Sequence, residues 1–214
     1  MRLQQLLLLL SVQLFSHATR GHSHQEPPPA TMKHVVAKGL RPCKAPPFAC
    51  VQAVSTHTPT PGRGEVLVRL TSSSVNPSDL DMEEQVGRLE GTLGVDFAGT
   101  VVEVGAGVAR LMVGDSVWGV TKGAYAEYVI AVELVTGVVP VGLNMSVAGT
   151  IPEVGATLLQ CLQRLGAPWD ATRNVTVVVT SGTGGTGELT MHVRRPRASH
   201  LRCFASAAAS QRPY

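Results

Sequence analysis

The sequence predicts a mixed α and β fold in which a strand-rich, barrel-like part precedes the beginning of an α/β unit. Residues 32–140 read as short strands separated by glycine-rich turns. After Pro140, apolar residues follow helical spacing, and a continuous apolar run then leads into a glycine-rich loop. We therefore expect one strand-rich domain at residues 32–140 and a partial α/β domain at residues 141–214.

The composition describes a globular chain with an aliphatic core. Of its 214 residues 44% are hydrophobic and 15% charged, against roughly 25% charged residues in average soluble domains, which excludes a highly charged disordered protein. Nine aromatic residues and a net charge of +3 are too few for a nucleic-acid-binding surface. At about 150 residues per domain, the length allows about one and a half domains.

The first residues are typical of a secretory signal peptide. Arg2 precedes an apolar run of about ten residues, which is too short to span a membrane, and Ser16 and Ala18 are suitable for cleavage. We expect residues 1–18 to be a signal peptide, residues 19–31 a linker, and the protein to enter the secretory pathway. The absence of acids before Glu26 leaves a mitochondrial presequence as the alternative. No second apolar run predicts a stable membrane span.

The cysteines do not form a zinc-binding pattern. They are Cys43, Cys50, Cys161 and Cys203, and no two of them are spaced C-x-x-C. In an oxidising compartment Cys43 and Cys50 are candidates for a disulfide. We expect Cys161 to be a small buried apolar residue of a helix.

Four segments carry the strand signal in residues 32–140. Polar and apolar residues alternate in Glu65–Leu70 and Tyr125–Ile130, Phe97–Val104 is apolar and β-branched, and Val113–Gly119 supplies a turn and a strand. Close spacing without long helices favours a compact barrel or folded sheet.

The pattern after Pro140 predicts helix, strand, glycine loop and helix in that order. Ser146 is the expected cap of a first turn, and a helix is expected over Val154–Leu165. Val175–Thr180 reads as a strand buried on both faces, and a helix is expected from Glu188, ending before Pro196.

The glycine loop between that strand and that helix fits the binding of a dinucleotide. Gly182 would allow the tight turn, Gly184 would let the backbone approach a pyrophosphate, and Gly187 would let the helix pack closely. A glycine-rich loop without a ligand is the alternative.

The order of motifs resembles the medium-chain dehydrogenase/reductase superfamily, especially its quinone oxidoreductase-like branch. The matching segments are Pro61–Val68, Val75–Asp79, Gly94–Val101, Val113–Gly119 and Gly123–Tyr128. The resemblance implies a GroES-like β-barrel catalytic domain followed by a Rossmann domain that binds NADPH. It also implies a small-molecule substrate, a quinone or enone.

The resemblance also bears on zinc. Zinc-dependent members carry Gly-His-Glu where this chain has Gly94-Val95-Asp96, and a cysteine ligand where this chain has Asn76. Since a catalytic zinc needs about three protein ligands, we expect no metal here. Side-chain hydroxyls, amides or water would polarise the substrate oxygen instead.

The same resemblance implies the residues that bind the cofactor. Asn76, Pro77, Ser78 and Asp79 match the segment at the nicotinamide end, and Thr157 matches a threonine near it. Gly184, Gly185 and Gly187 match the phosphate loop. Asn and Asp beside Pro are also ordinary turn formers, which is the alternative for Asn76 and Asp79.

Two tyrosines are left out of the expected site. We expect Tyr125 and Tyr128 to lie on one strand face and to serve packing rather than proton donation. No catalytic residue is therefore assigned from the sequence.

The resemblance leads us to expect a C-terminally truncated Rossmann domain that binds NADPH weakly. The expected activity is zinc-free, NADPH-dependent hydride transfer to a quinone or an activated C=C bond. A non-catalytic GroES-like module and an enoyl-thioester reductase are the alternatives. An exposed edge of an unfinished sheet would favour association, so a homodimer is allowed.

Overall fold

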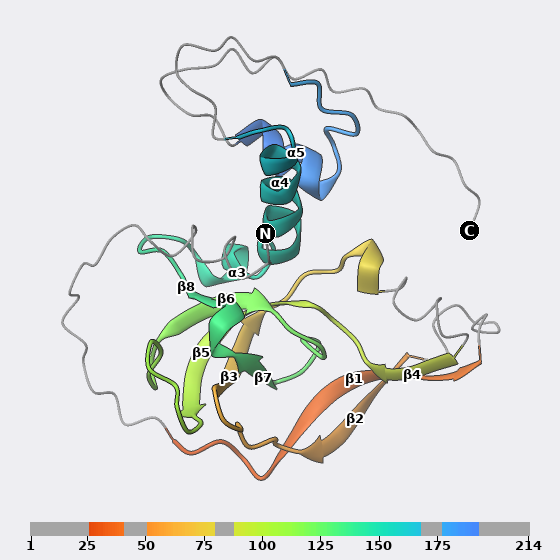
Figure 1. Cartoon of the computed structure of the whole chain (residues 1–214). Helices are drawn as coiled ribbons and strands as arrows, with labels where there is room; N and C mark the ends of the chain where they lie inside the picture. Colours follow the sequence, from red (N-terminus) through yellow and green to blue (C-terminus); the bar gives the residue numbers. More distant parts are fainter. Residues whose placement is uncertain (1–25, 41–50, 80–87, 168–176, 193–214) are drawn as a thin grey trace. The chain divides into compact units, whose positions relative to one another are not determined.

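The computed structural model describes residues 26–40, 51–79, 88–167 and 177–192 (Figure 1). The chain divides into two compact units, Met1–Glu153 and Val154–Tyr214, and each is described by itself. The strands of unit 1 are β1 Thr31–Leu40, β2 Val51–His57, β3 Glu65–Ser72, β4 Arg88–Thr92, β5 Asp96–Val104, β6 Ser116–Val120, β7 Tyr128–Val132 and β8 Thr136–Val138. The helices are the 3-10 turn η1 Glu133–Val135, then α3 Met145–Ala148, α4 Pro152–Arg164 and α5 Gly185–His192.

A five-stranded antiparallel sheet forms the larger part of unit 1, in the order β7-β3-β5-β6-β8. β3 and β5 contain the longest buried stretches of this sheet, and each has a neighbouring strand on both edges. Gly99 of β5 is required by this packing, since a Cβ there would lie 2.2 Å from the carbonyl oxygen of Arg69. The expected strands at Glu65–Leu70 and Phe97–Val104 are confirmed.

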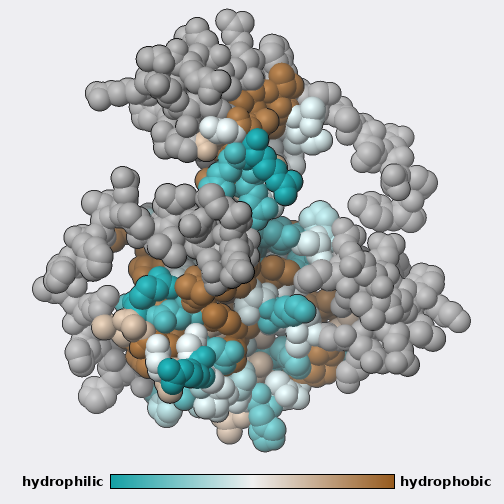
Figure 2. Space-filling view, in the orientation of Figure 1, coloured by the Kyte–Doolittle hydropathy of each residue, from teal (hydrophilic) through white to brown (hydrophobic). Residues whose placement is uncertain are grey.

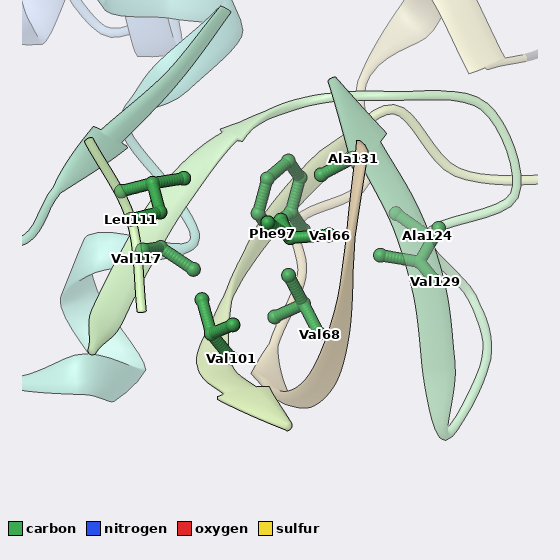
Figure 3. Close-up of a cluster of buried hydrophobic side chains, with 9 residues drawn as sticks. All are labelled: Val66, Val68, Phe97, Val101, Leu111, Val117, Ala124, Val129 and Ala131. Atoms are coloured by element: carbon green, nitrogen blue, oxygen red, sulfur yellow. The ribbon is translucent and has the colours of Figure 1, made fainter. Parts of the chain in front are cut away.

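The main hydrophobic core is formed by aliphatic residues from this sheet and its connecting loops around one phenylalanine. Phe97 is fully buried, and complete burial of a side chain of this size contributes about 1.5–3 kcal/mol. Figure 3 shows the cluster, whose buried members are Val66, Val68, Phe97, Val101, Leu111, Val117, Ala124, Val129 and Ala131.

A second, three-stranded sheet has the order β2-β1-β4. It is joined to the segment before β7, because the Val35 N–H donates to the Tyr125 carbonyl at 2.8 Å and His34 bridges Ala126. The Lys33 N–H also donates to Oε2 of Glu127 at 2.7 Å. The two sheets therefore form one folded β structure, as the close spacing of strands predicted.

The visible surface mixes hydrophilic and hydrophobic residues, shown teal and brown in Figure 2. Several large apolar side chains are exposed around β7 and β8, namely Val132, Leu134 and Val138. Scattered exposed apolar residues of this kind are ordinary for a folded domain.

Helices begin after Pro140, as expected, but their caps differ from the sequence interpretation. The N-cap of α3 is Asn144, whose Oδ1 accepts a hydrogen bond from the Ser146 N–H at 2.8 Å, so the expectation that Ser146 caps this helix is wrong. Asn144 can serve as the cap because its side-chain oxygen reaches the Ser146 N–H, which has no partner within the helix. α4 then begins at Pro152, where a missing N–H costs nothing. Cys161 of α4 is exposed, so the expectation of a buried thiol is wrong.

The described part of unit 2 contains most of α4, residues 177–180, the glycine loop and α5. The expected strand Val175–Thr180 is only partly described: residues 177–179 have no strand pairing, and Thr180 forms a single bridge. α5 begins at Gly185, three residues before the expected start at Glu188.

Some sequence predictions lie outside the described residues. They are the signal peptide, Cys43, Cys50, Cys203 and the chain after His192. Among the helices that are described, none is long and apolar enough to cross a membrane.

Candidate functional site

A cluster of buried and half-buried polar side chains lies where four parts of unit 1 meet. The loop after β3 supplies Ser74, Asn76, Ser78 and Asp79, and a helical turn at residues 77–79 positions the last two. The start of β5 supplies Asp96, the segment before β7 supplies Tyr125, and the start of α4 supplies Glu153.

Asp96 is the centre of the cluster and is fully buried. Its Oδ2 accepts hydrogen bonds from the Ser74 hydroxyl at 2.5 Å and the Asn76 amide at 2.8 Å. Its Oδ1 accepts one from the Glu153 N–H at 2.7 Å. Burial raises the pKa of Asp96 above its ordinary value, although these three donors oppose the increase. Because both oxygens are occupied, the carboxylate holds the loop, β5 and the start of α4 together.

Asp79 closes the helical turn and binds Tyr125. Its Oδ2 accepts from the Asn76 N–H at 2.7 Å and from the Tyr125 hydroxyl at 2.6 Å. The first bond satisfies an N–H at the beginning of the turn, as in a capping box. Burial and the Asp79 carboxylate together raise the pKa of Tyr125, so its hydroxyl stays protonated as a donor.

The expectation that Tyr125 and Tyr128 share a strand face is wrong, because β7 begins at Tyr128 and Tyr125 lies before it. Tyr125 does pack as expected, against the cluster of Ala37 and Leu93, and its hydroxyl also binds Asp79. Gly94 lets the tyrosine approach closely, since a Cβ there would lie 2.6 Å from the Tyr125 N. The sequence signal for this arrangement is the Gly94-Val95-Asp96 motif, which supplies both the glycine beside Tyr125 and the acid at the centre of the cluster.

Three buried oxygen atoms of the cluster have no hydrogen-bond partner within ordinary geometry. They are Ser78 Oγ, Asp79 Oδ1 and Glu153 Oε2. Burial raises the pKa of Glu153, the nearby Ser78 hydroxyl lowers it, and the negative charges of Asp96 and Asp79 raise it further. Ser78 and Glu153 therefore interact with each other across the cluster, whereas Asp79 Oδ1 has no neighbour of this kind among the described residues.

The residues predicted to lie at the nicotinamide end of the cofactor differ from one another in burial and in hydrogen bonding. The Asn76 and Asp79 side chains are buried and engaged within the chain, which fits the turn-forming alternative, whereas Pro77 is exposed. The Ser78 hydroxyl is buried and lies near the Glu153 carboxyl group. Thr157 lies exposed on α4, in unit 2.

The glycine loop of unit 2 has the close packing that its sequence predicts. A Cβ on Gly187 would lie 2.3 Å from the carbonyl oxygen of Ser181, so the helix start needs this glycine. Gly182 is buried as well, whereas Gly184 and Gly185 are exposed. The Gly184 N–H donates to the Ser181 carbonyl at 2.9 Å, and the N–H groups of the first turn of α5, which begins at Gly185, are of the kind that binds anions at helix starts.

Residues 62–142 match the alcohol dehydrogenase GroES-like domain. A chloroplast envelope quinone oxidoreductase homolog of Arabidopsis thaliana is 31% identical over 173 residues, which are 74% of this chain and 52% of that protein. The enoyl reductase component of lovastatin nonaketide synthase from Aspergillus terreus is 31% identical over 151 residues, 62% of this chain and 42% of that protein. The solved structure of a Coxiella burnetii quinone oxidoreductase is 25% identical with a TM-score of 0.68, and the match covers 83% of this chain and 57% of that one.

The β structure of unit 1 is thus the GroES-like domain of alcohol dehydrogenases. The chain belongs to the medium-chain dehydrogenase/reductase superfamily, and its relatives include quinone oxidoreductases and enoyl reductases. It spans about half the length of the relatives that it matches. The predicted mixed α and β fold class and the predicted family are therefore confirmed.

Proposed function

We propose that this chain takes part in the reduction of a quinone or an activated C=C bond by NADPH without a zinc ion. The observation that carries the proposal is the buried Ser78 hydroxyl, which lies close enough to the Glu153 carboxyl group to lower its pKa. In the proposal, this hydroxyl turns from Glu153 to donate to the carbonyl oxygen of a substrate. Such donors stabilise the negative charge that develops on the oxygen when hydride adds to the substrate.

The glycine loop fits the phosphate part of a dinucleotide. Gly184 and Gly185 are exposed at the start of α5, where backbone N–H groups and the helix dipole favour an anion. Gly187 permits the close packing that this arrangement needs. NADPH, when bound, supplies the hydride. Gly184, Gly185 and Gly187 would hold its phosphates, and Ser78 would orient the substrate.

The residues of the cluster do not make a zinc site. Asn76 stands where zinc-dependent members have a cysteine, and its amide donates to Asp96, so it is occupied as a donor. Val95 supplies no ligand atom, and both oxygens of Asp96 accept hydrogen bonds. A catalytic zinc needs about three protein ligands of the N, S or O type, which this arrangement does not offer.

Substrate-dependent oxidation of NADPH by the full chain tests the proposal. The assay uses NADPH in large excess and compares 1,4-benzoquinone, methyl vinyl ketone and an enoyl thioester. We expect turnover with the quinone or the enone and a large decrease in kcat in Ser78→Ala. A chain that oxidises NADPH with none of the three would contradict the proposal and favour the non-catalytic module. Preference for the thioester would favour the enoyl reductase alternative, in line with the Aspergillus terreus relative.

We also propose that the protein enters the secretory pathway. The apolar run near Arg2 and the small residues at Ser16 and Ala18 support this proposal. Sequencing of the mature N-terminus after expression in animal cells should find cleavage after Ala18. Recovery in mitochondria would support the presequence alternative instead.

A further inference from the structure

We propose that Asn144 is a site of N-linked glycosylation. The proposal rests on the proposed entry of the protein into the secretory pathway, where this modification takes place. Asn144-Met145-Ser146 meets the Asn-x-Ser/Thr rule for an acceptor. The structure places this tripeptide at the start of α3, in unit 1 (Figure 1).

The first argument is that packing turns the two residues that the rule requires outward. Ala148 of α3 is fully buried, and Leu143 and Met145 pack against the same apolar cluster. Asn144 and Ser146, which alternate with these residues, are exposed. The folded chain can therefore carry a bulky hydrophilic group at this position.

The second argument is the orientation of the Asn144 amide group. Its Oδ1 accepts a hydrogen bond from the Ser146 N–H at 2.8 Å. A backbone N–H needs an acceptor, so the amide nitrogen Nδ2 lies on the other side of the group. Within the described part of the chain Nδ2 makes no hydrogen bond, and Nδ2 is the atom to which a glycan is attached. Glycosylation would therefore leave the helix cap intact.

The third argument is that the fold does not use the Ser146 hydroxyl. The cap needs only the Asn144 side chain and the Ser146 backbone N–H. Among the described residues none forms a hydrogen bond with this hydroxyl, which belongs to an exposed residue. Helix capping accounts for Asn144, whereas the acceptor rule accounts for both residues.

The surroundings of Asn144 also suit a glycan. A Cβ on Gly142, in the adjacent turn, would have no atom within 4 Å, so the space beside the acceptor is open. Val141 and Val147, three residues before and after Asn144, are 95% and 48% exposed. A glycan attached between them would shield these two apolar side chains from water.

The modification is a group transfer that needs no oxidant or reductant. The donor is an oligosaccharide linked to a polyisoprenoid diphosphate, and a transferase of the secretory pathway joins it to the chain. The bond between the anomeric carbon of the sugar and a diphosphate oxygen breaks, and the diphosphate leaves with the electron pair. A bond forms between that carbon and Nδ2 of Asn144, and Nδ2 loses one proton to a base of the transferase.

The test is translation of the full chain in the presence of microsomes from animal cells. Protection from added protease reports entry into the microsomes. Peptide N-glycosidase in H₂¹⁸O then converts each glycosylated asparagine into an aspartate that carries ¹⁸O. Trypsin separates Asn144, on peptide 123–164, from a second acceptor tripeptide that begins at Asn174, outside the described residues. We expect mass spectrometry to find ¹⁸O at Asn144 in most of the protected chain.

Two variants remove the acceptor and keep the helix cap. Ser146→Ala retains the backbone N–H that binds Oδ1 of Asn144, and Asn144→Asp retains a side-chain oxygen that caps as well as asparagine does. Both should enter the microsomes as wild type does and migrate on a gel with one glycan fewer. Ser146→Thr, and Ser116→Ala at an exposed serine of β6, are the matched controls and should keep the glycan.

The outcomes separate the two proposals. A protected chain without ¹⁸O at Asn144 would overturn the glycosylation site and leave entry into the secretory pathway intact. Label at Asn144 that persists in Ser146→Ala would also overturn the site, because the modification would not follow the acceptor rule. A chain that stays fully sensitive to protease would overturn both proposals.

Discussion

Asp96 is the residue whose replacement should loosen the candidate site most. In Asp96→Ala, the Glu153 N–H, the Ser74 hydroxyl and the Asn76 amide lose their acceptor together. A buried donor left without a partner costs about 1–3 kcal/mol. The Asn76 amide can keep the Ser74 oxygen, 3.2 Å away, so we expect a total of about 3–5 kcal/mol rather than three full penalties.

Asp96→Asn should cost less, about 1–3 kcal/mol, because one acceptor oxygen remains for the Glu153 N–H. The pH dependence follows from the raised pKa of Asp96. A carboxyl whose pKa is higher in the folded state stabilises fully below its unfolded pKa, and this contribution is lost as pH rises through the folded pKa. Since asparagine does not titrate, the cost of Asp96→Asn should be greater at low pH than at neutral pH.

Urea unfolding followed by circular dichroism measures both effects. Asp115→Asn is the matched control, since it changes the same group where Oδ2 accepts from the Met112 N–H in an exposed turn, and it should cost under about 1 kcal/mol. Equal losses for Asp96→Ala and Asp115→Asn would refute the view that the buried network holds the site together. So would a cost of Asp96→Asn that grows as pH rises.

Three further predictions concern the glycines and the surface. Gly187→Ala should unfold the glycine loop and weaken NADPH binding at least tenfold in a fluorescence titration, because its Cβ would lie 2.3 Å from a carbonyl oxygen. Gly184→Ala, whose Cβ would lie at 3.4 Å, should retain the fold, and equal damage from both would contradict the packing argument. Gly99→Ala should lower the melting temperature by several degrees, since its Cβ would meet the backbone of β3 at 2.2 Å; an unchanged melting curve would show that the pairing of β3 and β5 is looser. Glu133→Gln should lower the free energy of unfolding by about 0.5–1 kcal/mol at neutral pH and by less in acid. Partial burial raises the pKa of Glu133, but the Arg110 N–H and guanidinium outweigh it and hold this pKa down. A stability difference that grows in acid would contradict this prediction.

The sequence predicted the middle of the five-stranded sheet well because local pattern and tertiary environment agree there. The alternation in β3 and the apolar run in β5 identify strands, and each of them has a neighbouring strand on both edges. The close packing at Gly187 was likewise expected from the glycine-rich loop, whereas the close approach of Gly99 to a backbone oxygen was not. The helix after Pro140 was found from its spacing.

The site itself depends on contacts that local pattern does not encode. Asp79 and Tyr125 are far apart in the sequence, and their hydrogen bond follows from the pairing of β1 with the segment before β7. Alternation placed Tyr125 in a strand, whereas the chain reaches β7 only three residues later. Glu153 was missed because a single acid at the start of a helix reads as a favourable dipole interaction.

The proposal that this chain transfers hydride from NADPH to an activated C=C bond or quinone is tested most directly by mass spectrometry. The full chain is incubated with methyl vinyl ketone and with NADPH that carries two deuterium atoms at C4 of the nicotinamide, so that deuterium is transferred from either face. We expect one deuterium atom at the β-carbon of the saturated ketone, and much less product from Ser78→Ala. Product without deuterium, or no product above the reaction without protein, would contradict the claim.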